Sequence, residues 1–570
     1  MAELTLHERY NLRRSELFTE RESWVPHWRD ISENLLPRAG RFLAEDGKEN
    51  DGGKRHNNIY DSTGTKALRI LSAGLMAGMT SPARPWFRLA VSDADLMEHE
   101  PVKLWLQKVT MLMREVFARS NTYRALHSGY EELGAFGTAA SFVMDDYDNV
   151  IHHHPLTIGE YAIAANEKGV IDTLYREFTM RVSQLVSEFV RQPDGSLKWD
   201  RVSSTVKNMW DSNQLDKRVK VTHVVEPRNM QANTSRRDRA RPWVSCYYES
   251  SGNEEKFLRE GGFRSFRVLV PRWSVSGGDI YGNSPGMEAL GDIRQLQHQQ
   301  FRKAQGIDYQ TRPPVQAPSS LTERDVSMLP GGVTFHDMAG PQSKISPLWE
   351  VRLDLQHLLF DIQDVRERIR STFYADLFMM IANDQRSNVT AREIAERHEE
   401  KLLMLGPVLE RLHNELLKPK IDMTFDRIVE AGILPPPPEE LQDMDLSVEF
   451  VSVLAQAQRA VGVQAVDRLV GTIASIAGAK QDPSIWDKLD TDQVVDAYSD
   501  MLGVDPNLIV ADAKVAVLRE KRNQQNAAMQ QAAMAQQQAQ TAKDLSAADT
   551  GGENLLTDLT NQFSGYSIPA

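Results

Sequence analysis

The chain has 570 residues, of which 41% are hydrophobic and 25% are charged. This is the composition of a folded globular protein and excludes wholesale disorder, and at about 150 residues per domain the length predicts three to four domains. The 66 basic and 79 acidic residues leave a formal net charge of −13. That balance argues against a protein that coats DNA by neutralising its phosphates, but it leaves open a protein that lets DNA pass.

Neither disulfides nor membrane spans are predicted. Cys246 is the single cysteine, so no intrachain disulfide can form, and a reducing compartment fits best. The amino terminus lacks the apolar core of a secretory signal, and no uninterrupted apolar run reaches the roughly 18 residues of a transmembrane helix. We therefore expect a protein that works in aqueous solution, without a membrane partner.

Helices dominate the first 135 residues, where apolar side chains recur at helical spacing. The predicted elements are helices around Trp24–Leu35, Ala67–Met79 and Val102–Phe117, and a short strand over Trp86–Val91. From about residue 139 to residue 273, short β-rich runs predict a mixed or antiparallel β region. Its clearest hairpin signal is the turn at Asn166–Gly169.

Two long helices follow, separated by a segment that cannot be helical. Ser284 can cap the first helix, with Pro285 at its first position, and this helix should extend to about Tyr309. The second helix begins near residues 346–347, and its apolar residues form a heptad seam. The seam consists of Val351, Leu355, Leu358, Ile362, Val365 and Ile369. Its spacing leaves open whether it packs inside the chain or between subunits. Prolines and glycines between the helices predict turns, with short strands near Val315 and Val333.

A third helix is predicted from Thr390, which forms a capping box with Glu393. Its leucines keep heptad phase across Gly406-Pro407, so we expect a kink there and not an end. Residues 376–389 read as a loop, residues 435–438 as a stiff proline boundary, and residues 450–522 as helical. The Gln/Ala-rich residues 523–540 are compatible with a helix or with a disordered tail.

One motif suggests a hydrolase. Gly282-Asn283-Ser284-Pro285-Gly286 matches the Gly-x-Ser-x-Gly nucleophile elbow. In that elbow the residue after the serine donates its backbone N–H to the oxyanion, and proline has none to donate. We therefore interpret Ser284 as a helix cap and predict no catalytic residue. The sequence also lacks a P-loop, so no nucleotide cofactor is expected.

Three polar clusters have alternative readings. His152-His153-His154 could bind a metal, but neighbouring residues of a strand point to opposite faces, so an ordinary strand end is the simpler interpretation. Asp145, Asp146 and Asp148 could form a divalent-metal site, and a turn before Asn149 explains them with less. The arginines at positions 236, 237, 239 and 241 could contact phosphates or another subunit, or form a solvated loop. We predict no metal site.

Several short motifs, in consistent order, resemble the head-to-tail connector, or portal, proteins of short-tailed bacteriophages. They are Asp61-Ser62-Thr63, the run Leu75–Pro82, Pro85-Trp86-Phe87, Tyr281–Gly286, Thr390–Ile394, Leu405–Leu409 and Glu415-Leu416-Leu417. The resemblance covers roughly residues 10 to 520. It implies an α+β, mostly helical subunit with an α/β wing, a two-helix stem, a small β-containing clip and a helical crown.

The resemblance also implies a division of the chain. The parts are the wing at 1–280, stem helix 1 at 281–310, the clip at 311–346, stem helix 2 at 347–374, a tunnel loop with a kinked helix and wing return at 375–434, the crown at 435–522, and a barrel helix or flexible tail at 523–570. It implies a homo-oligomeric ring, typically of twelve copies, at one capsid vertex of the virion, assembled in the host cytoplasm.

Through this ring double-stranded DNA would be packaged and ejected, with the terminase motor, a tail adaptor, and the major capsid and scaffold proteins as partners. The tunnel loop would lie nearest the DNA and present Gln385, Arg386 and Asn388. The seam residues would be candidates for packing between subunits. Two other functions remain as alternatives: a non-portal virion scaffold or tail component, and a hydrolase that uses Ser284.

Overall fold

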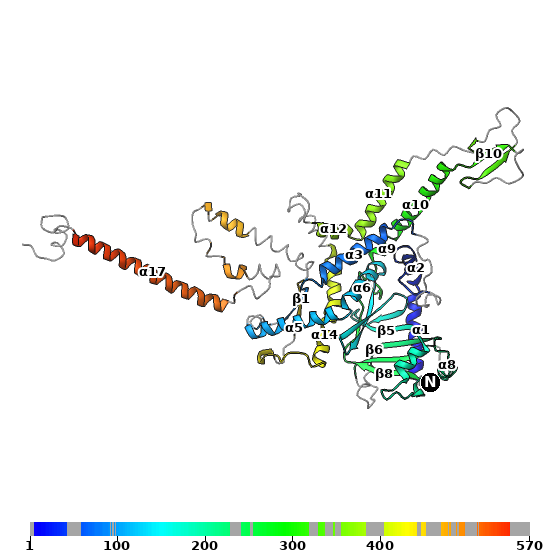
Figure 1. Cartoon of the computed structure of the whole chain (residues 1–570), viewed down its shortest axis with the longest axis horizontal. Coiled ribbons are helices and arrows are strands. Elements are labelled where there is room, and N and C mark those ends of the chain that lie inside the picture. The colour runs from blue at the N-terminus through cyan, green and yellow to red at the C-terminus, as the bar shows by residue number, and fades with distance from the viewer. Residues whose placement is uncertain are drawn as a thin grey trace, which may run out of the picture. The chain divides into compact units, whose positions relative to one another are not determined.

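The computed structural model describes most of the chain. The described residues are 5–42, 59–91, 93, 96, 99–228, 241–250, 255–318, 329–336, 346–347, 355–383, 404–441, 446–451, 469–476, 478–479, 486, 489–495, 510 and 512–547. The chain divides into two compact units, Met1–Val461 and Gly462–Ala570. The fold is mixed α and β with small sheets, so the prediction of the α+β class is confirmed (Figure 1).

The predicted amino-terminal helices and strand are present as α2 (Val25–Asn34), α3 (Thr63–Met79), β1 (Phe87–Val91) and α5 (Glu100–Arg119). Two helices that were not predicted individually, α1 (Leu6–Glu22) and α6 (Thr122–Phe136), belong to the same helical region. Local sequence signals set several of their ends. Thr5 and Glu8 form a capping box at the start of α1, and α6 ends at Gly137, which adopts a left-handed conformation with φ of 76°. The apolar faces of α3, α5 and α6 are buried in one core.

The middle of the chain forms two antiparallel sheets, as predicted. The first has the order β3-β2-β9 and the second the order β4-β5-β6-β7-β8. Their strands are β2 (Ala140–Asp146), β3 (Val150–Leu156), β4 (Tyr161–Ala165), β5 (Ile171–Arg181), β6 (Arg218–Pro227), β7 (Trp243–Glu249), β8 (Phe257–Phe263) and β9 (Val268–Leu269). The hairpin turn lies where the sequence placed it, because Asn166 caps the turn and Gly169 supplies a positive φ of 73°. Between β5 and β6 the chain adds the short elements α7 (Val182–Leu185), η2 (Val186–Val190), η3 (Trp199–Arg201) and α8 (Ser204–Asp211).

Two rods then lead to a small sheet and back (Figure 1). The outward rod consists of α9 (Pro285–Glu288) and α10 (Leu290–Thr311), and the returning rod is α11 (Leu355–Thr372). At the tip, β10 (Val315–Pro318) pairs parallel with β11 (Val333–His336) and antiparallel with β12 (Ser346–Pro347). The predicted rods and the predicted short strands near Val315 and Val333 are confirmed. The predicted start of the second helix is wrong, because residues 346–347 pair with β10 as β12 and α11 spans Leu355–Thr372.

The region after α11 differs from the predicted loop. Tyr374 takes a positive φ of 53°, and a further helix, α12 (Ala375–Asn383), follows at once. The loop prediction for residues 376–383 is therefore wrong. Leu377 and Phe378 are buried, and a Cβ added at Gly74 of α3 would lie only 2.2 Å from the Phe378 ring. This close approach holds α12 against α3.

The third predicted helix continues through Gly406-Pro407, since residues 404–412 are helical. It passes into the π-helical segment η6 (His413–Leu417) and then into α14 (Lys418–Glu430). The expected capping box at Thr390 lies outside the described residues. After α14 and the short 3-10 turn η7 (Glu439–Leu441), strand β13 (Leu446–Phe450) pairs antiparallel with β1.

The pairing of β13 with β1 explains why the boundary between the two units lies at residues 461–462 and not at the prolines of residues 435–438. The carbonyl of Pro435 accepts a hydrogen bond from the Trp105 indole at 3.0 Å, and Leu441 is buried, so the chain after the prolines still belongs to the first unit. In the second unit, α17 (Asp512–Ala547) includes the Gln/Ala-rich segment, which is therefore helical. Its side chains from 516 to 541 are exposed.

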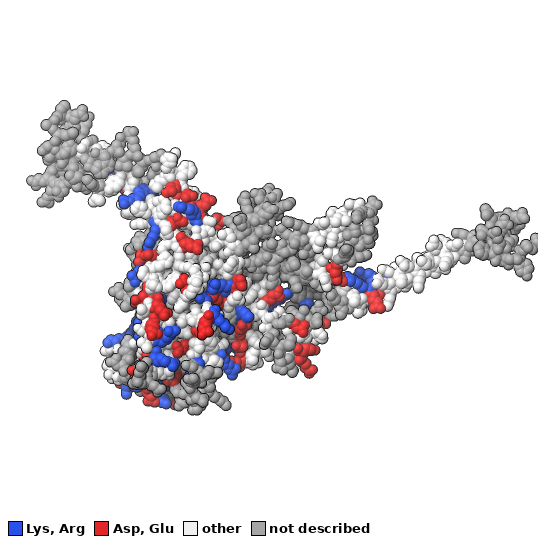
Figure 2. All heavy atoms as spheres, turned by 180° about the vertical axis from the view of Figure 1, so that it is seen from behind, with Lys and Arg blue, Asp and Glu red and all other residues white. Residues whose placement is uncertain are grey.

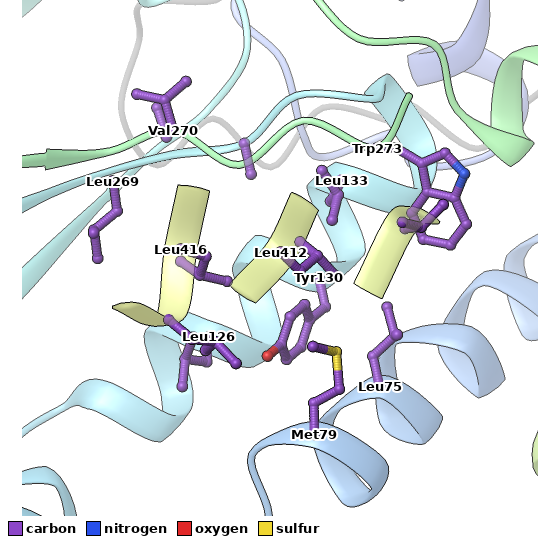
Figure 3. Packing of buried hydrophobic residues seen from close by; sticks show 14 of the residues in the cluster. Leu75, Met79, Leu126, Tyr130, Leu133, Leu269, Val270, Trp273, Leu412 and Leu416 are labelled. Atoms are coloured by element: carbon purple, nitrogen blue, oxygen red, sulfur yellow. The ribbon is translucent and has the colours of Figure 1, made fainter. Parts of the chain in front are cut away.

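One apolar cluster forms the main core of the first unit. It joins side chains from α3, α6, β9, η6 and the preceding helical turn, including Leu75, Tyr130, Leu269, Leu412 and Leu416, which converge in Figure 3. Two smaller clusters lie on the large sheet. Within the described part of the chain, no helix is both long and apolar enough to cross a membrane.

Candidate functional site

The paired rods α10 and α11 are the most distinctive feature of the first unit, and the predicted seam lies between them and the body. Ile362, Val365 and Ile369 are at most 1% exposed and belong to the main core cluster. Leu358 is half-buried, whereas Val351 and the side chain of Leu355 lie outside the described residues. For the three buried positions the intrachain interpretation of the seam therefore holds, because α11 packs on α10 and α3 of its own chain.

Another part of the rods carries apolar side chains that are partly exposed in the single chain. Phe360 is 75% exposed and its neighbour Leu359 is 47% exposed. On α10, Phe301 and Ile307 are also exposed. Large apolar groups that cluster on paired helices favour contact with another protein surface. The seam residues were predicted as candidates for packing between subunits, whereas these exposed side chains were not, although Phe360 is close to the seam residues in the sequence.

A buried network fixes the rods to the body at the start of α3. The Asp61 carboxylate accepts hydrogen bonds from Arg366 on α11, from Gln300 on α10, and from the backbone and hydroxyl of Thr63. Gln297 adds to this network, because its amide oxygen accepts from the backbone N–H of Tyr60 and of Asp61. The carboxylate of Asp61 therefore accepts hydrogen bonds from both rods.

The charge of Asp61 is stabilised by these contacts. Burial alone would raise the pKa of its carboxyl, but hydrogen bonds from Thr63 and Arg366 outweigh burial and hold the pKa below its usual value. Asp61 is thus ionised at neutral pH and pairs with Arg366 at 2.7 Å. The sequence analysis used Asp61 only as part of a resemblance. Its signal in the sequence is the Asp-Ser-Thr turn before a helix.

The Gly-x-Ser-x-Gly motif is a packing element. The Ser284 hydroxyl donates to the carbonyl of Ala135 at 2.7 Å and accepts from the backbone N–H of Met287 at 3.0 Å, and the residue is fully buried. The prediction that Ser284 caps a helix is confirmed. Both glycines touch the end of α6, since a Cβ at Gly286 would lie 2.6 Å from the carbonyl oxygen of Ala135. The motif thus seats the first rod on α6.

A second buried ion pair holds the π-helical segment. Arg272 is 3% exposed, and its guanidinium contacts the Glu415 carboxylate at 2.7 Å while also donating to the carbonyl of Gly169 at 2.8 Å. Arg411 pairs with the same carboxylate at 3.1 Å. Glu415 lies one helical turn before Lys418, so this contact fixes the long helix to the hairpin turn of the large sheet. Sequence spacing gave no sign of it, because the partners are 143 residues apart.

The polar clusters of the sequence have structural explanations. His153 is buried, whereas His152 and His154 are exposed on the opposite face of β3. Asp146 accepts from the backbone N–H of Asp148 at 3.0 Å, which confirms the turn, and Asp145 pairs with Arg267 and Arg427. Among the described residues, no group of three or more His, Cys, Asp and Glu could hold a metal ion.

The predicted tunnel-loop residues Gln385, Arg386 and Asn388 lie outside the described residues, as do the arginines at 236, 237 and 239. Charges of both signs alternate over the body and the rods in Figure 2, whereas most of α17 carries neither. Ion pairs such as Arg294–Asp30 at 2.7 Å and Arg368–Asp292 at 3.5 Å account for part of this pattern. The described rods thus offer apolar and paired surfaces suited to protein contact.

Comparisons with known proteins agree with this description. The family model described as "Bacteriophage head to tail connecting protein" matches residues 7–510. The chain is 56% identical over 567 residues to the "Probable portal protein" of Bordetella phage BPP-1, with 100% of both chains covered. It is 44% identical over 563 residues to the "Portal protein" of Salmonella phage epsilon15, with 98% of this chain and 99% of that protein covered.

Proposed function

Because this chain belongs to the bacteriophage head-to-tail connecting proteins, we propose that its copies form the ring through which a phage packages and ejects its DNA. A portal conducts double-stranded DNA at the junction of head and tail, and this is the function of the chain. The full-length similarity to two portal proteins carries the conclusion. The finer points of the proposal concern how the ring is held together and what contacts the DNA.

We propose that the exposed row on the rods packs against sister subunits. Phe360 and Leu359 on α11 are 75% and 47% exposed, Phe301 and Ile307 on α10 are exposed by more than a third, and a ring would bring the rods of adjacent copies together. The intrachain burial of Ile362, Val365 and Ile369 supports this assignment, since the seam holds each rod pair to its own body and leaves the other face available. Twelve copies would complete the ring.

The partners follow the parts of the subunit. The tip sheet of β10, β11 and β12 would meet the terminase motor and later the tail adaptor, and the wing would meet the major capsid and scaffold proteins. The helix α17, which carries no charged side chain from residue 523 to residue 542, would line up with its copies as a barrel. The ring would assemble in the host cytoplasm and remain in the virion.

Twelve copies at −13 each would give the whole ring a formal charge of −156, and acidic groups along the channel would repel phosphates and reduce sticking of the sliding duplex. Gln385, Arg386 and Asn388 would make transient contacts with DNA. If so, Arg386→Ala should change the rate of translocation in a packaging assay. Unchanged packaging would remove Arg386 from the DNA contact.

The experiment that tests the ring is native mass measurement of the purified chain together with end-on electron micrographs. We expect a closed ring with a central hole wide enough for duplex DNA. A non-portal scaffold or tail component would give an assembly without such a hole, and a folded monomer at micromolar concentration would contradict the proposal. The hydrolase alternative requires a free Ser284 hydroxyl, whereas this hydroxyl is buried and has two partners.

A further inference from the structure

A mainly apolar cavity of about 140 Å³ lies where α14 and η6 pack on α6 and on the strands β2 and β3. One water needs roughly 10–15 Å³, so the cavity has room for several waters or for a small molecule. Leu126, Leu269 and Leu416 form its apolar side and approach from three different elements in Figure 3. The polar side carries groups whose hydrogen-bonding capacity is not filled.

Lys420 is the central polar group of this cavity. It is only 2% exposed, and its Nζ lies 3.3 Å from Nε2 of His153, which is 1% exposed. When Lys420 carries its proton, its ammonium can only donate, so Nε2 of His153 accepts and the ring proton is on Nδ1. Within the described part of the chain, Nδ1 of His153 has no hydrogen-bond partner, and neither does the buried hydroxyl of Ser141. Both residues line the cavity.

With Lys420 charged, the cavity keeps donors that have no acceptor among the described residues. An ammonium has three N–H groups, and a single contact of Lys420 is found among the described residues. A buried cation without its partners is costly, as is a buried polar group that lacks a hydrogen bond. A ligand with several acceptor oxygens and a negative charge would satisfy Lys420, His153 and Ser141 together.

Glu132 lines the same cavity from α6. Its Oε2 accepts from the backbone N–H of Ile158 at 3.1 Å, and no ion pair joins it to Lys420 among the described residues. Burial raises the pKa of Glu132 to about 7, and burial lowers the pKa of Lys420 to about 7. A rise in pH therefore removes protons from both groups, so the cavity becomes less positive as the pH rises.

We propose that this cavity binds a small oxyanion, with a phosphate or a carboxylate group, through Lys420, His153 and Ser141. The bound ion would join the long helix at α14 to the strands β2 and β3 and to α6. This site is independent of the ring and of the channel. It rests on the cavity, the buried cation and the unfilled donors, and the loss of positive charge with rising pH predicts its dependence on pH.

The groups that face Lys420 define that dependence. They are His153 from β3 and Glu132 from α6, while Glu160 and Arg41 act on Glu132 and His152 acts on His153. Burial and the charge of Lys420 keep the pKa of His153 well below its usual value, so His153 stays neutral across the tested range. Anion binding should therefore be strongest near pH 6 and at least fivefold weaker at pH 8.5.

The experiment uses the full chain and titrates sodium phosphate, and separately sodium acetate, against a chloride background of matched ionic strength. The readouts are isothermal calorimetry and the thermal unfolding midpoint at pH 6 and at pH 8.5. A saturable response to phosphate alone would show that the ligand carries a phosphate group, and a response to acetate alone would show that it carries a carboxylate. A response to both would show a general oxyanion site. No saturable response to either at pH 6 would mean that the cavity holds only water, and would overturn the proposal.

Two variants locate the site. Lys420→Met should abolish the saturable response, and Ser141→Ala should weaken binding at least threefold. Lys418→Met is the matched control, because Lys418 is exposed on the same helix and should leave binding unchanged. If Lys420→Met does not fold, Ser141→Ala decides the outcome, since its small change leaves the apolar wall intact. Unaltered binding in Ser141→Ala, or an equal loss in Lys418→Met, would place the anion elsewhere and refute the assignment.

Discussion

Arg366 on α11 donates two hydrogen bonds to Oδ2 of Asp61, from Nε at 3.1 Å and from Nη2 at 2.7 Å, although 305 residues separate the two in the sequence. The carboxylate of Asp61 also accepts a hydrogen bond from the side-chain amide of Gln300 on α10, at 3.0 Å. One buried charge thus holds both rods at the level where they leave the body. The strength of this attachment can be measured directly.

Arg366→Gln should lower the free energy of unfolding by about 1–3 kcal/mol, because Asp61 keeps its buried charge and loses its cation. The pKa of Asp61 is held below its usual value, so this contribution is present at neutral pH and is lost as the pH falls through the folded-state pKa. Thermal unfolding at one fixed protein concentration, at pH 7 and below pH 4, measures both effects. Arg370→Gln, at an exposed position of the same helix, is the control. Equal effects of the two substitutions would contradict this role of Asp61.

Arg272→Ala should cost about 3 kcal/mol, because it leaves Glu415 partly buried without its main partner and removes the donor to Gly169. Arg411→Ala removes the other cation from the same carboxylate. Arg411 is about a third exposed and pairs with Glu415 one helical turn along the same helix. Its replacement should therefore lower the free energy of unfolding by only about 0.3–0.5 kcal/mol. Chemical denaturation of both variants gives the comparison. A larger loss for Arg411→Ala would show that the π-helical segment is not held through Arg272.

Glu132→Gln should change how stability depends on pH. The folded-state pKa of Glu132 is about 7, above the usual 4.5, so the wild-type protein binds more protons when folded and loses stability as the pH rises from 4.5 to 7. The Gln variant lacks this loss. Between pH 4.5 and 7 its free energy of unfolding should therefore rise by about 1–3 kcal/mol relative to that of the wild type. Unfolding midpoints at pH 5 and pH 7.5 test it. A constant difference between the two proteins would mean that Glu132 titrates normally.

Phe360→Ser should weaken ring assembly and leave the folded subunit intact, because the side chain is 75% exposed in the single chain. Sedimentation or native mass measurement should show smaller species, with circular dichroism unchanged. Gln363→Ser, on the same helix and also exposed, provides the comparison and should assemble normally. Rings that form as readily with Phe360→Ser as with the wild type would remove this row from the subunit interface.

Gly286→Ala and Gly291→Ala should act in opposite directions. A Cβ at Gly286 would lie 2.6 Å from the carbonyl oxygen of Ala135, so the backbone must shift, and we expect a loss of roughly 1–3 kcal/mol. At Gly291 of α10 a Cβ meets nothing within 4 Å, and alanine should stabilise the helix by about 0.5–1 kcal/mol. Unfolding midpoints decide. Similar gains at both positions would show that the motif does not seat the rod on α6.

The sequence predicted the elements whose signals are local. Apolar spacing predicted α2, α3 and α5, turn residues predicted the hairpin at Asn166, and a capping serine followed by a proline predicted the start of the first rod. Residues 376–383 form a helix and not the predicted loop, because the apolar side chains from Leu377 onward pack on α3, and the local sequence does not indicate this partner.

Long-range contacts were beyond reach of local patterns. The register of β1 with β13 places Phe87 opposite Phe450, and no periodicity in either segment indicates this partner. Lys420 lies in a stretch of mixed charge that resembles a solvated helix face, and its burial follows only from the packing of α14 on β3. The heptad seam included the buried side chains of Ile362, Val365 and Ile369 but left their partner open, because the spacing of an apolar stripe does not specify what covers it.

The pairing of β13 with β1 determines where the chain can be shortened. A protein cut at the proline run would lose β13, and β1 would present bare backbone N–H and C=O groups to neighbouring molecules, which is a template for aggregation. A protein cut after Val461 would retain this closure. The first unit can therefore be produced by itself only if it carries the strand that arrives some 360 residues after its partner.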